Sequence, residues 1–266
     1  MASQAPNDLP PLYADLQPIQ RPVHGDKMFK RIDGIRTLGR THAVPVTVDE
    51  FVLVQRHFPI IFSSGEAPVP LALMGLNEGV NTFFDAEGQP RNPDETFYIP
   101  AYVRRYPFML SRLQQDSDQL SLCVDPTAGA IVDTGGDTQL FDGEQPSAAT
   151  NEILAFCEQF EQAGQRTTAF MRELQDLKLL MEGEVAIQPD GAQQPFIYRG
   201  FQMVDEEKFR ELSGDKLRKL NQSGGLGVIM SHLFSLSLVR DIFGRQVAQG
   251  TGPAGAGAAA PATAEA

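Results

Sequence analysis

The stretch that decides the fold runs from Thr150 to Leu174, TNEILAFCEQFEQAGQRTTAFMREL. Its apolar and small residues recur at alternating spacings of four and three, which places them on one stripe of a helix. The pattern predicts a helix that begins with Thr150 or Asn151 as N-cap and extends to about Met181, before Gly183. The stripe consists of Ile153, Cys157, Phe160, Gly164, Thr167, Met171 and Leu174.

Such a regular stripe has two interpretations, a coiled coil or packing within the protein. It covers only about three heptads, which is short for a coiled coil. It also contains Gly164 and Thr167, whose small side chains favour close packing. We therefore expect this helix to pack closely on the protein's own sheet.

The residues before this helix predict one short helix followed by strands. Thr47 and Glu50 have the spacing of a capping box, and Pro59 ends the helix at Phe58. The segment 59–64, PIIFSS, is typical of a buried strand. Further apolar runs separated by turn residues predict antiparallel pairing. These runs are PLALMGL (70–76), NTFFD (81–85), PFMLSRL (107–113) and LSLCVD (120–125).

The residues after the long helix predict a hairpin and then short helices. EVAIQ (184–188), a turn at 189–191 and FIYRGFQMV (196–204) form the hairpin pattern. Helical segments follow at 206–213, at 215–222 and from Leu226, with breaks at Gly214 and at 223–225. The predicted fold class is α+β, an antiparallel sheet on which a long amphipathic helix and a C-terminal helical cluster pack.

The domain organisation follows from composition. Residues 1–20 are rich in proline and polar residues and are expected to be flexible. Residues 21–248 are expected to form a single globular domain with two lobes and a hinge at about 126–148, where glycines gather. Residues 249–266 contain mostly Gly, Ala, Pro and Thr and are expected to form a disordered tail.

The overall composition narrows the class of function. The 266 residues are 42% hydrophobic and 21% charged, with a formal net charge of −12. Because nucleic-acid binding requires phosphate neutralisation, we expect no nucleic-acid partner. The N-terminus lacks a signal-peptide pattern, and the most apolar segment, Leu226 to Val239, is shorter than the roughly 20 residues of a membrane span. We expect a cytoplasmic protein without a membrane span, and leave open an export route that needs no signal peptide.

Three segments together resemble the SapC family of bacterial proteins. They are YIPAYVRRYPF from Tyr98, YRGFQMVDEEKFREL from Tyr198 and SGGLGVIMSHLFSL from Ser223. The resemblance covers about Leu9 to Phe243. The family takes its name from a surface-layer gene locus, and the resemblance implies no particular reaction or set of catalytic residues.

The first candidate site is the cluster Arg104, Arg105, Tyr106 and Phe108. It is the densest group of cationic and aromatic residues in an otherwise acidic chain. Arginine suits carboxylate or phosphate recognition, and with aromatic residues it is enriched at binding interfaces. The alternative is that the arginines pair with the chain's own carboxylates while Tyr106 and Phe108 enter the core.

The second candidate is an anion site at Gly224, Gly225 and Gly227, which lie before a predicted helix. Backbone N–H groups at a helix N-terminus bind anions. However, a helix rather than a strand is predicted before these glycines, and no lysine follows the last of them. The alternative is a break between two closely packed helices.

The third candidate is a metal site. His24 and Asp26 have the spacing of a facial iron site, for which His57 or His232 would be the third ligand. His232 could instead act as a general base for a neighbouring serine, but Ser231 and His232 are adjacent and point about 100° apart on a helix. The alternative is a core histidine whose hydrogen bonds are satisfied.

These observations favour a non-catalytic binding or accessory protein of a peptide, a protein or a small anionic ligand, without a cofactor. One alternative is a metal-dependent, 2-oxoglutarate-type oxygenase that uses His24 and Asp26. The other, from the resemblance, is a structural or export protein associated with a surface layer.

Overall fold

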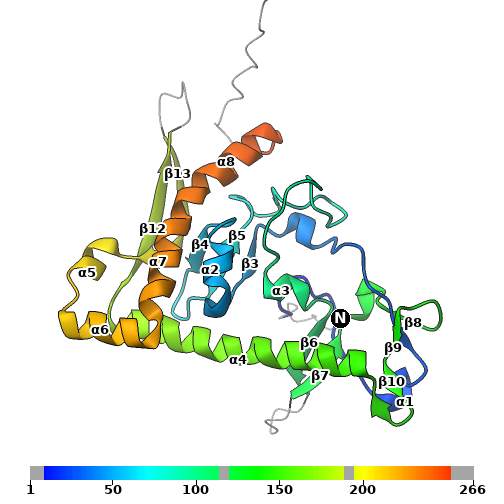
Figure 1. Cartoon of the computed structure of the whole chain (residues 1–266). Helices are drawn as coiled ribbons and strands as arrows, with labels where there is room; N and C mark the ends of the chain where they lie inside the picture. The colour runs from blue at the N-terminus through cyan, green and yellow to red at the C-terminus, as the bar shows by residue number, and fades with distance from the viewer. Residues whose placement is uncertain (1–8, 114–119, 189–194, 253–266) are drawn as a thin grey trace, which may run out of the picture.

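The computed structural model describes residues 9–113, 120–188 and 195–252 (Figure 1). It confirms the α+β class, since antiparallel sheets are combined with helices. The central sheet has five strands in the order β12-β13-β4-β5-β3, all paired antiparallel. Its strands are β3 (Ala43–Pro45), β4 (Ile60–Ser63), β5 (Pro70–Leu73), β12 (Leu180–Ile187) and β13 (Phe196–Val204).

The buried strand and the hairpin occur as predicted. Ile60, Ile61 and Phe62 of β4 are all buried, as expected for a strand that is covered on both faces. β12 and β13 form the hairpin, whose turn at 189–191 lies outside the described residues. The apolar run at 81–85 is not a strand and contributes only an isolated bridge between Phe84 and Pro90. Its backbone is instead held by the side chain of Asn81.

Helix α4 (Ala148–Asp176) is the long predicted helix, with different ends. Its N-cap is Ser147, whose hydroxyl accepts from Thr150 N at 3.2 Å, so the choice of Thr150 or Asn151 is wrong. The helix ends at Asp176 rather than near Met181, because the chain must turn to enter β12 at Leu180. The predicted stripe faces inward: Cys157, Thr167, Met171 and Leu174 are buried, and Ile153, Phe160 and Gly164 are partly buried.

The expected intramolecular packing of α4 is confirmed. It lies against strand β6 (Phe108–Arg112) and the 3-10 turn η2 (Val48–Glu50), where Val48 N donates to Thr167 Oγ1 at 3.0 Å. In Figure 1 the helix runs along the lower side of the molecule, from the C-terminal helices at one end to the small sheets at the other. It therefore borders both the central sheet and the smaller strands.

The C-terminal segment forms helices, of which the last two α-helices lie along the central sheet (Figure 1). The helices of this segment are α5 (Glu206–Arg210), α6 (Gly214–Ser223), α7 (Gly225–Ser235), η4 (Leu236–Leu238) and α8 (Val239–Ala248). Within the described residues, the 24-residue run Gly225–Ala248 is long and apolar enough to cross a membrane by length and composition. The run extends past Val239, the end that was expected from the sequence. Its inner face, including Ile229, Val239 and Ile242, belongs to the main core.

Most of the remaining elements gather at the other end of α4, whereas α2 lies beside α7 and the central sheet (Figure 1). At that end of α4, Phe108, Leu110, Val124 and Cys157 form a second, smaller hydrophobic cluster. Residues 126–148, predicted as a loop or hinge, contain several two-residue strands. The two-lobe organisation stays a prediction. The elements are β1 (Gln17–Pro18), α1 (Arg21–His24), β2 (Met28–Phe29), η1 (Leu38–Arg40), α2 (Phe51–Val54), α3 (Ala101–Arg104), β7 (Leu120–Val124), η3 (Pro126–Ala128), β8 (Ile131–Val132), β9 (Thr138–Gln139), β10 (Phe141–Asp142) and β11 (Gln145–Pro146).

Candidate functional site

Arg104 and Arg105, predicted to act together, lie in different environments at the end of α3. Successive residues of a helical turn point about 100° apart. The Arg105 side chain is 5% exposed, and Nη1 lies 3.3 Å from Oε1 of Glu161. Its guanidinium lies 4.1 Å from the ring centre of Phe160 and 4.8 Å from that of Tyr102, so cation–π contacts replace water around it. Arg105 is therefore part of the core.

Arg104 is exposed, and its guanidinium is held in place. Nε donates to the carbonyl of Ile99 and Nη2 donates to the hydroxyl of Tyr98, each at 3.1 Å. The guanidinium lies over the ring of Phe156, 5.2 Å from its centre. Among the residues that the structure describes, no carboxylate forms an ion pair with Arg104. A positioned cation is thus presented to solvent.

Glu50 connects this arginine to the predicted capping box. The box is present at Thr47 and Glu50, as the spacing indicates, and Oε1 of Glu50 accepts from Thr47 N at 3.3 Å. Its Oε2 accepts from Tyr98 Oη at 3.1 Å and from Ala101 N at 3.0 Å. Burial raises the pKa of Glu50, while these hydrogen bonds and the charge of Arg104 oppose the rise. The sequence indicated the cap but gave no sign that the same carboxylate orients Tyr98.

Two adjoining cavities lie along α4 and share Thr47 and Phe160. We call them together the α4 groove. The apolar cavity has a volume of about 200 Å³ and the polar cavity about 180 Å³. Each is smaller than the roughly 300–1,000 Å³ typical of small-molecule sites, so a ligand of that size would have to span both cavities. The apolar cavity is lined by residues including Pro45, Pro68, Val69, Pro70, Gly164 and Met171; the polar one by residues including Asp49, Glu50, Tyr98, Arg104, Phe156 and Gln159.

The other two members of the predicted cluster are structural. Phe108 is buried and packs against Phe29, with ring centres 5.2 Å apart. Tyr106 is half-buried, and its hydroxyl donates to Oδ2 of Asp125 at 3.4 Å. Burial, with the nearby Asp125, raises the pKa of Tyr106 to about 12. The four residues therefore do not form one site, and the aromatic partners of Arg104 are Tyr98 and Phe156.

The three glycines of the second candidate lie at the junction of α6 and α7. Gly224 has φ of +81° and ends α6 in the left-handed conformation that favours glycine. Gly225 N donates to the hydroxyl of Ser223, and an oxygen of Glu173 lies 3.6 Å from the position that a Cβ on Gly225 would take. A carboxylate of the protein itself thus lies near this helix N-terminus, where it stabilises the helix dipole. The geometry is that of a helix break.

The residues of the third candidate are not brought together. In the described part of the chain, no group of three or more His, Cys, Asp or Glu side chains is arranged to hold a metal ion. Nδ1 of His24 lies 3.2 Å from the backbone N and O of Gln20. Both ring nitrogens of His232 are engaged by the sheet: Nε2 accepts from Val204 N at 3.1 Å, and Nδ1 donates to the carbonyl of Ile60 at 2.8 Å.

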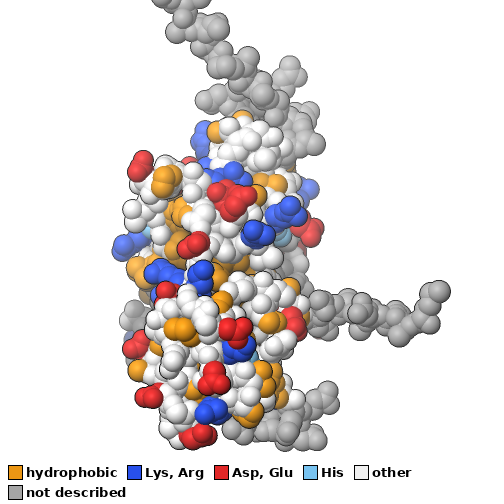
Figure 2. Space-filling model, turned by 90° about the vertical axis from the view of Figure 1, so that its right-hand side faces the viewer, with side chains coloured by type: hydrophobic (Ala, Val, Ile, Leu, Met, Phe, Trp, Pro, Cys, Tyr) orange, Lys and Arg blue, Asp and Glu red, His pale blue; other side chains and the backbone are white. Residues whose placement is uncertain are grey.

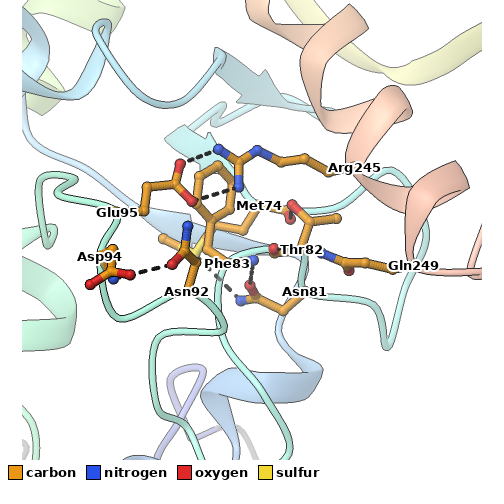
Figure 3. Close-up of polar contacts among 9 residues, drawn as sticks. All are labelled: Met74, Asn81, Thr82, Phe83, Asn92, Asp94, Glu95, Arg245 and Gln249. Carbon is orange, nitrogen blue, oxygen red and sulfur yellow. Dashed lines mark hydrogen bonds and ion pairs between the residues drawn. The ribbon is translucent and has the colours of Figure 1, made fainter.

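A polar cluster that no sequence motif indicates fastens α8 to residues 74–95 (Figure 3). Arg245 forms a two-point ion pair with Glu95 while its guanidinium lies 4.4 Å from the ring centre of Phe83. The side chain of Asn81 accepts from the backbone N–H groups of Phe83 and Phe84. Gln249 Nε2 donates to the carbonyl of Thr82 at 3.0 Å. These groups satisfy one another, so the cluster is a structural clamp.

Figure 2 shows how charged side chains are distributed on one face of the molecule. Acidic and basic side chains are interspersed there with apolar ones, and no broad area carries basic side chains alone. A basic face is what phosphate-backbone binding needs. On this face the structure offers no such surface.

Fold and site together define an α+β protein with a groove between its long helix and the 45–47 and 68–70 segments, and with a positioned arginine at one end of that groove. A family model, SapC, matches residues 19–242. The chain therefore belongs to the SapC family. No curated protein and no solved structure matches it significantly.

Proposed function

We propose that this SapC-family protein is a non-catalytic binding protein, and that the α4 groove is its binding site. Its ligand carries an anionic group that pairs with Arg104 and an apolar part that lies over Phe160 toward Met171. Of the ligand kinds expected from the sequence, a small anionic molecule suits the groove best, because two adjoining cavities of about 200 and 180 Å³ leave room for a small molecule that spans both.

The proposal rests on Arg104, whose guanidinium is held in one position and exposed to solvent. An exposed arginine normally loses side-chain entropy when it is held in one geometry. Here Ile99, Tyr98 and Phe156 hold it without an ion-pair partner among the described residues. A preorganised cation beside an apolar cavity lowers the entropic cost of binding an amphiphilic anion.

The roles of the neighbouring groups support binding rather than acid–base chemistry. Both oxygens of Glu50 accept hydrogen bonds from within the protein, and Tyr98 Oη lies between Glu50 and Arg104. These groups orient one another and Arg104. Three of the roughly four acceptor positions of the Glu50 carboxylate are used in this way, so its role in the structure is to hold Tyr98 and the start of α3 in place.

The test is titration with 8-anilinonaphthalene-1-sulfonate, a fluorescent probe with one anionic group and an apolar body. We expect saturable binding by the full chain that weakens at least tenfold in Arg104→Gln. Arg240→Gln is the matched control, because Arg240 is an exposed arginine on α8 that does not line either cavity. Equal probe affinity for Arg104→Gln and Arg240→Gln would disprove the proposed site.

A further inference from the structure

We propose that the ligand of the α4 groove is an aliphatic carboxylate: one carboxylate held by Arg104 and an unbranched hydrocarbon chain in the apolar cavity. This inference rests on the proposed binding function and adds the chemical class of the ligand. It follows from which edge of Arg104 is open, which charges surround it, and which hydrogen-bonding groups the apolar cavity offers.

The open edge of Arg104 matches a planar anion. Nε and Nη2 donate to Ile99 and Tyr98, which uses one side of the guanidinium fork. Nη1 has no hydrogen-bond or ion-pair partner among the described residues, and Nη2 carries a second hydrogen. Two parallel N–H donors of this kind bind the two oxygens of a carboxylate.

The charges around Arg104 favour a ligand with a single negative charge. Asp49 and Glu50 line the same polar cavity, and Glu50 is linked to Arg104 through the hydroxyl of Tyr98. Asp49 is paired with Arg166, whose Nη2 lies 2.5 Å from Oδ2. Glu50 has no such ion pair among the described residues, so a dianionic phosphate would bring its second charge toward this carboxylate, and like charges at short range repel. A carboxylate monoanion meets less repulsion.

The apolar cavity leaves few hydrogen-bond donors for a ligand. Pro45, Pro68 and Pro70 have no N–H group, and the N–H groups of Val46 and Val69 donate to Pro70 O and Ser63 Oγ. The hydroxyls of the two threonines on α4 donate to helix carbonyls at 163 and 164. A peptide in this cavity would leave carbonyl groups unpaired, which costs free energy. A hydrocarbon chain has no such groups.

Gly164 borders the apolar cavity. A Cβ at this position would meet no atom within 4 Å, so the glycine allows no close packing, and the sequence-based explanation of Gly164 is wrong. Glycine inside a helix is destabilising by roughly 0.5–1 kcal/mol relative to alanine. The structure shows open space beside this glycine, at the middle of the groove. A hydrocarbon chain can lie across it.

The experiment is calorimetric titration of the full chain with laurate below its micelle concentration. Parallel titrations use octanoate, dodecyl phosphate, methyl laurate and an apolar peptide with a free C-terminal carboxylate. We expect laurate to bind most tightly, with about two- to fourfold tighter binding for each methylene beyond octanoate, as the apolar area buried per methylene implies. Methyl laurate, which lacks the charge, should bind at least tenfold more weakly.

Arg104→Gln tests the contact with the carboxylate, and Gly164→Leu tests the apolar cavity; each has a matched control. Arg104→Gln should weaken laurate at least tenfold, whereas Arg240→Gln should not. Gly164→Leu fills the apolar cavity and should weaken laurate far more than octanoate, whereas Gly164→Ala, with a side chain too short to block it, should weaken laurate less than threefold. Thr168→Leu, also at the apolar cavity, replaces Gly164→Leu if that variant does not fold.

The outcomes distinguish this inference from the proposed function. If dodecyl phosphate or the peptide binds more tightly than laurate, and Arg104→Gln abolishes this binding, the ligand is not an aliphatic carboxylate. The proposed binding function would then still hold. Laurate binding that is insensitive to both Arg104→Gln and Gly164→Leu would overturn the assignment of laurate to the groove. If no compound and no sulfonate probe binds in an Arg104-dependent way, both proposals fail.

Discussion

Arg105 Nη1 lies 3.3 Å from Glu161 Oε1, in an ion pair whose arginine side chain is 5% exposed and whose glutamate is 38% exposed. The glutamate reaches water, whereas the arginine depends on the protein for its solvation. Nε of Arg105 is buried and has no hydrogen-bond partner. The pair is thus asymmetric, and the two neighbouring arginines should respond differently to mutation.

Arg105→Ala should lower the free energy of unfolding by about 2–5 kcal/mol, because it leaves a cavity among aromatic rings and removes the partner of Glu161. Arg105→Met should cost less, since methionine fills the volume and needs no hydrogen bond. Arg104→Ala should cost about 0–1 kcal/mol because its side chain is exposed. Urea titrations measure the free energy of unfolding of all three variants. Equal losses of stability for Arg104→Ala and Arg105→Ala would contradict the different roles of the two arginines.

His232 should make stability depend on pH. Burial lowers its pKa to about 4, and its Nε2 must stay unprotonated to accept from Val204 N. Because the unfolded histidine has a pKa near 6.5, the unfolded state binds a proton first as pH falls. The stabilisation is complete above about pH 6.5 and is lost toward pH 4, by roughly 3 kcal/mol over this window.

The measurement is urea unfolding of the wild type and of His232→Gln from pH 7.5 to pH 4.5. The wild type should lose more stability than the variant over this range, although it is the more stable of the two at neutral pH. The comparison removes contributions from carboxylates common to both proteins. If the free energies of unfolding of the wild type and of His232→Gln change with pH in parallel, His232 does not titrate in this way.

Gln246→Ala should lower the free energy of unfolding by about 2–4 kcal/mol. Gln246 is fully buried; it accepts from Leu76 N at 2.6 Å and donates to Asn77 Oδ1 and Thr251 O. Its removal leaves several buried polar groups unpaired. Gln249 is an exposed residue of the clamp with a single hydrogen bond, to Thr82, so Gln249→Ala should cost about 1 kcal/mol or less. Thermal and urea unfolding measure both variants. A larger loss of stability for Gln249→Ala than for Gln246→Ala would contradict this assignment of roles.

Gly164→Ala should raise the free energy of unfolding by roughly 0.5–1 kcal/mol, because alanine has the higher helix propensity and its Cβ would enter open space. Thermal melts of the two proteins at neutral pH measure the difference. A lower melting temperature for the variant would show that the apolar cavity closes in solution.

Truncation after Gly252 should leave the melting temperature nearly unchanged, because residues 253–266 contain no large apolar side chain to bury. Truncation after Ala248 should lower it by a few degrees. The second cut removes Gln249 and also Thr251, whose N–H donates to the carbonyl of Gln246 at 2.9 Å. Equal melting temperatures for the two truncated proteins would show that residues 249–252 add nothing.

The sequence by itself determined the features that depend on local rules. The period of the stripe from Ile153 to Leu174 indicates a helix and its inward face, because helical geometry repeats every 3.6 residues. The spacing of Thr47 and Glu50 indicates a capping box, because the reciprocal hydrogen bonds span three residues. The β12–β13 hairpin and the α+β class follow in the same way.

The tertiary structure alone decided what each polar side chain does. Arg104 and Arg105 are neighbours of the same type, and only the position of α4 buries one of them beside Phe160 and leaves the other at the groove. His232 is a possible metal ligand in the sequence. In the structure its two ring nitrogens are occupied by backbone groups of Ile60 and Val204, which are 172 and 28 residues away along the chain. Desolvation and hydrogen bonding act between residues that are close in space, and distances along the chain do not reveal them.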